Sequence, residues 1–80
     1  DDKNKKIEIY PNPATDLITI TGTMQWTNIS IYNSQGGIVF KSLLNNNQTY
    51  LDISKFNKGI YVIVINSNKH IYTEKLLIIK

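Results

Sequence analysis

The chain of 80 residues contains no cysteine and no arginine, and it has only two prolines, one tryptophan and one histidine. Without cysteine no disulfide can support the fold, although small secreted domains often depend on disulfides. A chain of this length forms one domain and buries only about 60–65% of its unfolded surface. Its stability must therefore come from packing alone. The lack of cysteine does not decide the compartment, because cytosolic proteins and exported bacterial proteins can both lack it.

The lack of arginine argues against a nucleic-acid site. The net charge of +3 comes from lysine, whereas arginine supplies the planar fork that reads phosphate and guanine. A lysine-only surface of this modest charge is better explained by a need for solubility. We therefore expect no nucleic-acid partner.

Long apolar runs are absent as well. None approaches the roughly 20 residues that a membrane span needs, so we expect no direct insertion into a membrane. Asp1 and Asp2 open the sequence with no apolar stretch behind them, which is unlike a signal peptide. So abrupt a start predicts that the chain is a piece cut from a longer protein.

Residues that could perform catalysis or hold a metal are few and scattered. His70 is the one imidazole, and without a thiol it suggests no pairing of nucleophile and base. Structural zinc sites need clustered cysteine or histidine. Asn12, Thr15 and Asp16 could supply oxygen ligands to calcium, but capping and turn bonding explain them more simply. We therefore expect no enzyme activity, no cofactor and no metal site.

Short β-rich runs separated by turn residues recur at intervals of about ten, which is typical of a sandwich or barrel. Residues 33–37 (NSQGG) predict a hairpin turn, because glycine accepts positive φ, and residues 54–58 predict a single turn. The continuous apolar run 60–65 predicts a central strand buried on both faces. No segment has a convincing helical period. The pattern predicts an all-β, immunoglobulin-like β-sandwich of about seven antiparallel strands, at 7–10, 17–21, 26–32, 38–44, 49–53, 60–65 and 70–80.

The aromatic residues allow two interpretations. Trp26 and the five tyrosines could form a platform on which sugar rings stack. We favour packing, because each tyrosine lies in or at the end of a predicted strand, where aromatics pack across their neighbours. A structural or adhesive immunoglobulin-like module, including a carbohydrate-binding one, stays open as the alternative function. The tyrosines are Tyr10, Tyr32, Tyr50, Tyr61 and Tyr72.

Four stretches follow one another in an order and at spacings typical of one family. They are residues 10–20 (YPNPATDLITI), 29–36 (ISIYNSQG), 51–64 (LDISKFNKGIYVIV) and 75–80 (KLLIIK). Together they resemble the type A C-terminal sorting domain of cargo proteins carried by the type IX secretion system (Por secretion system) of Bacteroidota, an immunoglobulin-like sandwich. The chain departs from that family at Gly37, where lysine is usual, and at Phe56, where leucine is commoner.

The resemblance implies that the domain is a secretion signal. It divides the chain into a linker remnant at 1–6 and a sorting domain at 7–80. The domain would direct an exported cargo protein from the periplasm through the outer-membrane translocon, with the translocon and its shuttle proteins as partners. A sortase-like signal peptidase would typically remove it, and the cargo would end at the cell surface or outside the cell. The domain would be substrate and ligand, never catalyst.

The motif residues have structural explanations beside the functional ones. Gly59 permits a turn that a Cβ would block, and Tyr61 anchors the next strand. Pro11 and Pro13 rigidify the first connection. The last strand is the better candidate for direct contact, because a free sheet edge can accept a partner strand. The candidate recognition and motif residues are Pro11, Asn12, Pro13, Gly36, Asp52, Gly59, Tyr61, Lys75, Leu76, Leu77, Ile78, Ile79 and Lys80.

Overall fold

The computed structural model describes residues 7–23, 26–44, 47–67 and 69–80. These residues form seven β-strands and no helix, so none of them belongs to a helix that could cross a bilayer. The segment 1–6, expected to be a linker remnant, lies outside the described residues. The strands are β1 (Glu8–Tyr10), β2 (Leu17–Thr21), β3 (Asn28–Tyr32), β4 (Ile38–Leu43), β5 (Gln48–Asp52), β6 (Gly59–Asn66) and β7 (Ile71–Ile78).

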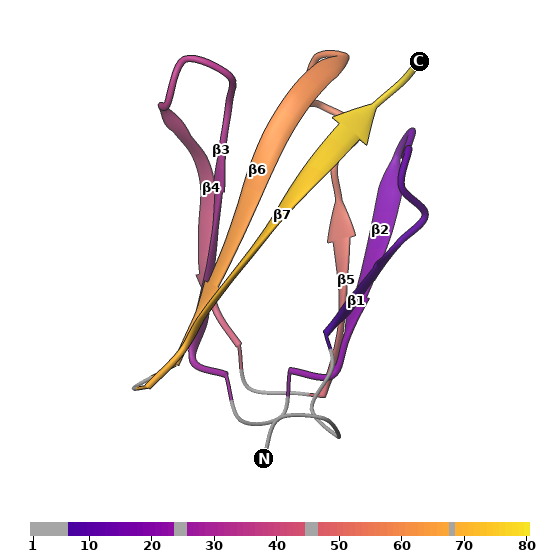
Figure 1. Cartoon of the computed structure of the whole chain (residues 1–80). Coiled ribbons are helices and arrows are strands. Elements are labelled where there is room, and N and C mark those ends of the chain that lie inside the picture. The colour runs from indigo at the N-terminus through magenta and orange to yellow at the C-terminus, as the bar shows by residue number, and fades with distance from the viewer. Residues whose placement is uncertain (1–6, 24–25, 45–46, 68) are drawn as a thin grey trace.

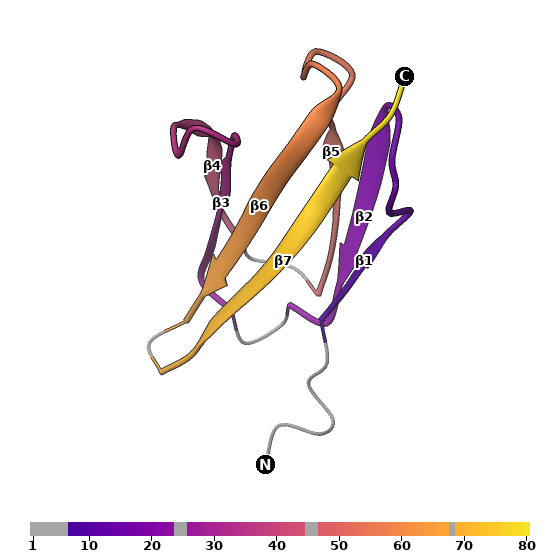
Figure 2. The same ribbon diagram turned by 45° about the horizontal axis from the view of Figure 1, so that its top comes forward.

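The strands form two sheets that pack face to face (Figures 1 and 2). One sheet has the order β1-β2-β5 and the other has the order β4-β3-β6-β7. Every pair of neighbouring strands is antiparallel. Seven antiparallel strands in two layers with these crossovers make an immunoglobulin-like sandwich, and the expected fold class is confirmed.

The core between the two sheets is built mainly from isoleucine. Strands β2, β3 and β6 bury every second side chain, as strands with one face toward a core must. β-Branched side chains fit the pleat, and each one that is fully buried contributes about 1.5–3 kcal/mol. Because the chain has no disulfide, this layer holds the sheets together. Its largest fully buried apolar members are Ile18, Ile20, Ile29, Ile31, Ile53, Ile63, Ile65, Leu76 and Ile78.

Strand β6 departs from the expectation for its apolar run. The sequence predicts burial on both faces, and this prediction is wrong. Tyr61, Ile63 and Ile65 are buried, whereas Ile60 is exposed and the two valines between them are half-buried. A sandwich has only two layers, so the second face of even a central strand points outward. An unbroken apolar run therefore marks the middle of a sheet here, but not a second covered face.

The connection between β1 and β2, which belong to the same sheet, reaches the edge of the other sheet. After β1 the chain turns through Pro11 and Pro13, whose missing N–H groups prevent the ladder with β2 from continuing. Ala14 then forms an isolated parallel bridge with Ile78 of β7. Because the bridge joins a loop of the first sheet to the edge strand of the second, it ties the two layers together along one side of the sandwich (Figure 2).

Candidate recognition surface

Three loops and the end of the chain share one end of the sandwich (Figure 1). All four of the sequence stretches contribute to this end, which we call the motif pole: residues 11–16, 33–37, 53–58 and 79–80. The Ile53 N–H donates to the Asp16 carbonyl at 2.8 Å, and the Lys80 ammonium donates to the Ser54 carbonyl. The ends of β2, β4 and β6 and the start of β1 lie at the other end with the described residues next to them, and we call that end the opposite pole.

The side chain of Asn12 takes the place of a neighbouring strand beside β7. Its Nδ2 donates to the Lys75 carbonyl at 2.9 Å, and its Oδ1 accepts the Leu77 N–H at 3.1 Å. A further hydrogen bond of 3.3 Å joins Nδ2 to the Glu74 carboxylate. A primary amide carries the donor and the acceptor of a peptide group, so it can satisfy two backbone groups at a sheet edge.

The backbone of Ala14 continues this cover. The Ala14 N–H donates to the Leu77 carbonyl, and the Ile79 N–H donates to the Ala14 carbonyl, both at 2.8 Å. The edge of β7 is therefore covered at the Lys75 carbonyl, at both backbone groups of Leu77 and at the Ile79 N–H. A partner strand that paired with this part of the edge would have to displace these bonds.

The terminal stretch divides between core and surface. Two of its side chains are buried between the sheets and four are exposed, in keeping with the period of a strand. Deleting the stretch would remove core packing together with any contact surface, so loss of sorting after deletion would not separate the two roles. The buried residues are Leu76 and Ile78, and the exposed residues are Lys75, Leu77, Ile79 and Lys80.

Asn33 closes the β3–β4 hairpin from within, a role that the sequence interpretation missed. Its Oδ1 accepts the N–H groups of Gln35 and Gly37 at 3.0 and 2.9 Å. Gly36 adopts a φ of 89°, a left-handed conformation that favours glycine. The motif glycine therefore has a structural role. Gly37 is exposed beside it, so this loop lacks the lysine that the resemblance leads one to expect.

Asp52 fixes the start of the 53–58 loop. Its Oδ1 accepts the Ser54 N–H at 2.9 Å, which is the side-chain-to-backbone bond of an Asx turn. Hydrogen bonds from Ser54 lower the pKa of the Asp52 carboxyl below its ordinary value, and the charges of Lys55 and Lys80 act in the same direction. Asp52 therefore stays ionised as a turn-forming group.

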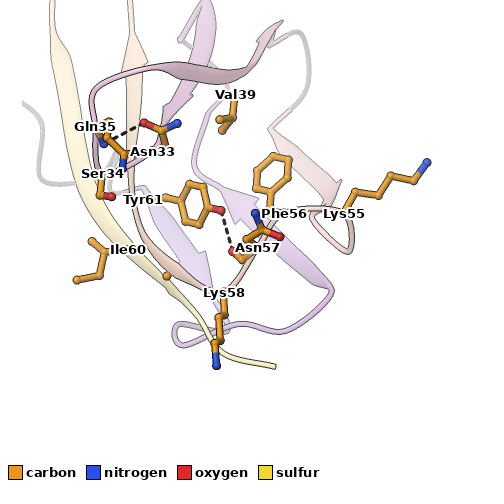
Figure 3. Close-up of a pocket in the computed structure, with 11 residues that line it drawn as sticks. Asn33, Ser34, Gln35, Val39, Lys55, Phe56, Asn57, Lys58, Ile60 and Tyr61 are labelled. Carbon is orange, nitrogen blue, oxygen red and sulfur yellow. Dashed lines mark hydrogen bonds between the residues drawn. The ribbon is translucent and has the colours of Figure 1, made fainter.

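Tyr61 holds the same loop from its other end (Figure 3). The residue is 7% exposed, and its hydroxyl donates to the Asn57 carbonyl at 2.7 Å. Its ring packs against the ring of Phe56, with centroids 5.5 Å apart. A tyrosine near the start of a strand that bonds to the backbone a few residues upstream is the tyrosine corner of immunoglobulin-like folds. In this geometry Tyr61 anchors the start of β6, as expected from the sequence.

Gly59 lies between the loop and the tyrosine and has a φ of 146°. Residues that carry a side chain rarely adopt this backbone conformation, so glycine is favoured there. A Cβ at this position would meet no atom within 4 Å. The constraint at Gly59 is therefore the backbone angle and not a lack of space.

A cleft of about 560 Å³ opens between the 33–37 hairpin and the 54–58 loop. The rings of Phe56 and Tyr61 line it together with the aliphatic side chains of Val39 and Ile60. Lys55 and Lys58 extend away from the rings (Figure 3). No carboxylate is among its lining residues. The cleft therefore offers ammonium groups, amides and aromatic rings to a binding partner.

Tyr72 and Glu74 extend the network of Asn12 along β7. The Tyr72 hydroxyl donates to the Glu74 carboxylate, which also accepts from Asn12. Burial raises the pKa of Tyr72 to about 12, and the hydrogen bond and the charge of Glu74 add to this effect. The sequence alone could have indicated this contact, because residues two apart on a strand share a face.

The opposite pole is also fixed by side chains that bond to backbone. The Ser67 hydroxyl accepts the N–H groups of Lys69 and His70 at 3.2 and 3.0 Å. The Thr27 hydroxyl donates to the Asn66 carbonyl at 2.9 Å. His70 is exposed, as expected for a surface histidine. None of these residues belongs to the four motif stretches.

The tyrosines fall into different classes of burial. The packing interpretation is confirmed for Tyr61, which is buried, and Tyr72 packs partly buried against the core. It is wrong for Tyr10 and Tyr50, which are exposed. Their positions in short strands indicated a β structure correctly. Each tyrosine is next to a buried apolar residue, Ile9 or Leu51, so the period of two turns the tyrosine to the outer face of the sheet.

Sequence comparison places the chain among known proteins. The family model described as the secretion system C-terminal sorting domain matches residues 8–80. A funoran endo-beta-hydrolase from Wenyingzhuangia aestuarii is 32% identical over 78 residues, which cover 92% of this chain. Beta-agarases D and A from Zobellia galactanivorans are 30% and 39% identical, over 76% and 72% of this chain. The chain spans only 11 to 12% of the length of these three relatives.

Structural comparison agrees on the fold. A solved structure of PorZ, an essential bacterial surface component of the type-IX secretion system of Porphyromonas gingivalis, superposes with a TM-score of 0.84. The match covers 99% of this chain and 12% of that chain, at 16% identity, a level that shows the shared fold alone. The match over residues 8–80 goes further: this chain belongs to the family of secretion system C-terminal sorting domains, the non-catalytic tails of type IX secretion cargo.

Proposed function

We propose that the motif pole is the surface that the type IX translocon and its shuttle proteins read, so that the domain addresses the cargo joined to it. One observation supports this most strongly. Four stretches that lie far apart in the sequence meet at one end of the sandwich (Figure 1). Asn12, Asp52 and Tyr61 use their polar groups to hold the loops there, so contact falls to the exposed groups that these loops display.

The exposed groups at the motif pole favour an acidic partner surface. Lys55, Lys58 and Lys80 are exposed there and outnumber the one exposed carboxylate, that of Asp16. The cleft beside the first two offers aromatic rings with no lining carboxylate. A partner that presents a carboxylate next to an apolar side chain would match both features. Strand addition to β7 is not part of this proposal, because Asn12 and Ala14 already bond to the part of that edge next to the motif pole.

The position of the chain ends fits the proposed route. β1 begins at the opposite pole (Figure 1), so a cargo that precedes it would leave the motif pole uncovered. We expect transit through the periplasm, passage through the outer-membrane translocon and removal of the domain by a sortase-like peptidase at the cell surface. Residues 1–6 would then belong to the linker in which the cut falls.

A fusion experiment tests the sorting function. Residues 1–80 are joined behind an exported fluorescent reporter in a type IX-competent bacterium and in a matched strain without the translocon. We expect the reporter at the surface or in the medium of the competent strain only. Retention of the reporter inside the competent strain would contradict the proposal.

The same experiment separates the sorting signal from the alternative function. An adhesive or structural module would leave the reporter inside both strains, because no translocon would read it. The exposed tyrosines do not replace the sorting function with an adhesive one, since the family match covers residues 8–80. They do, however, mark a surface that sorting at the motif pole does not use.

A further inference from the structure

The outer face of the β1-β2-β5 sheet carries two tyrosines in one cross-strand row. Tyr10 lies opposite Thr19, and Thr19 lies opposite Tyr50. Residues directly opposite each other in antiparallel strands share a face. The tyrosines are 46% and 63% exposed, and Thr19 between them is half-buried. Exposed apolar side chains that occur singly need no explanation, but two aligned aromatic residues mark a surface.

The rest of this face is neutral at its centre. Leu17, two positions along β2 from Thr19, is 50% exposed, and Thr21 and Gln48 add a hydroxyl and an amide in the next row. The charges on the paired positions of this face are the carboxylates of Glu8 and Asp52. They lie on the two outer strands, in the rows on either side of the tyrosines. Aromatic rings therefore alternate with neutral polar groups, and no lysine occupies these paired positions.

The size of the face helps to identify its occupant. Three strands about 4.8 Å apart and five residues of β2 at about 3.4 Å each give a face of roughly 250 Å². A specific protein interface buries about 800 Å² on each partner, which is several times more. A carbohydrate chain of a few rings fits the smaller area. The two tyrosines stand two strand spacings apart, so consecutive contacts along one extended chain can reach both.

We infer that this face binds a neutral polysaccharide. A pyranose ring has apolar C–H groups on its faces and hydroxyls at its rim. The rings of Tyr10 and Tyr50 would stack on those faces, while the Thr21 hydroxyl and the Gln48 amide bond to the hydroxyls. The carboxylates of Glu8 and Asp52 disfavour sulfated or carboxylated chains on this face.

This binding face is separate from the cleft at the motif pole. No residue of the tyrosine row lines that cleft. The row lies on the β1-β2-β5 sheet, whereas Ile60 and Tyr61 of the cleft belong to β6 in the other sheet. The inference does not rest on the sorting function. Each can fail without the other, so the two can be tested separately.

Titration calorimetry of the 80-residue chain tests the inference. The probes are a neutral β-glucan, a neutral xylan, a neutral galactan and one sulfated galactan, in about 0.3 M salt so that the lysines are screened. We expect at least one neutral polysaccharide to bind, and Tyr10→Ala and Tyr50→Ala each to weaken it about tenfold. Tyr50→Phe should keep the affinity, because stacking needs the ring and not the hydroxyl.

The control variant is Leu43→Ala, which removes an exposed apolar side chain from the other sheet and should leave the affinity unchanged. Thermal melts confirm that each variant folds, which these exposed positions favour. The inference is overturned if no neutral polysaccharide binds, if only the sulfated galactan binds, or if Tyr50→Ala binds as tightly as the unchanged chain. Self-association that Tyr50→Ala abolishes, without glycan binding, would also overturn it.

The reporter fusion distinguishes the two surfaces. Tyr50→Ala should be sorted normally while it loses the polysaccharide. If the unchanged fusion is retained inside the cell and the isolated chain still binds a neutral polysaccharide, the sorting proposal fails and this inference stands.

Discussion

The two poles of the sandwich are held by the same kind of bond but differ in their sequences. At the motif pole, Asn12, Asn33 and Tyr61 bond across connections to backbone groups. At the opposite pole, Thr27 and Ser67 make equivalent bonds, yet neither residue belongs to a motif stretch. If the motifs served stability alone, both poles should carry them. The difference therefore suggests that the motif pole is marked because it is also read.

The comparison is sharpened most by the tyrosine corner. Tyr61→Ala removes a buried ring and its hydroxyl bond, and we expect it to lower the free energy of unfolding by about 3–5 kcal/mol. Tyr61→Phe removes only the bond to Asn57 and should cost about 1 kcal/mol. Urea denaturation measures both. Equal effects of the two variants would show that the ring does not stabilise the motif pole.

Gly59 gives the next largest effect. Gly59→Ala places a side chain at a φ of 146° and should cost about 1–3 kcal/mol through backbone strain, because no neighbouring atom is in the way. Gly37→Ala is the matched control, since Gly37 has no positive φ. Thermal or urea unfolding should show a small change for the control. A cost at Gly59 no larger than that at Gly37 would refute the strain argument.

Asn12 and Ser67 compare the two poles directly, because each side chain bonds to two groups of the backbone. Asn12→Ala should cost about 1–2 kcal/mol and expose the Leu77 N–H to hydrogen exchange. Ser67→Ala should have a similar or smaller cost and expose the N–H of His70 instead. Amide exchange by NMR locates the change. Unaltered protection at Leu77 would show that Asn12 does not cover the edge of β7.

Asp52 gives the smallest effect and one that depends on pH. Its pKa is lowered in the folded chain, so its contribution to stability is present above the ordinary value of 3.8 and is lost as the pH falls through the lower folded value. Asp52→Asn should reduce the loss of stability in that acid range. Urea midpoints at pH 6 and at about pH 3 measure it. If the stability of the Asp52→Asn variant fell with acid as much as that of the unchanged chain, Asp52 would not contribute to the acid dependence.

Sequence patterns were sufficient for the layers of the fold and for the turns. Period-two alternation in runs such as Leu17–Thr21 predicts strands with one buried face, and the paired glycines in residues 33–37 predict the hairpin. The local bond from Ser54 to Asp52 follows the same short-range logic. These features depend on neighbours in the chain, which is why one sequence can reveal them.

Features that depend on distant partners were not predictable. Asn12 covers β7 through groups 63 and 65 residues away, and only the assembled register brings them together. The predictions for the outer face of β6 and for the packing of Tyr10 and Tyr50 were wrong for a related reason. Hydrophobicity identifies a strand, but the number of layers and the width of each sheet decide which face is covered.

The central claim is that the motif pole is the surface that is read, and paired charge reversals test it most directly. Lys55→Glu with Lys58→Glu changes exposed residues of the motif pole, and Lys41→Glu with Lys69→Glu changes exposed residues elsewhere by the same charge. The measurement is the fraction of the reporter fusion at the cell surface, with melting temperatures as the folding control. The account predicts retention of the first double variant inside the cell and normal sorting of the second. Equal sorting of the two folded variants would contradict it.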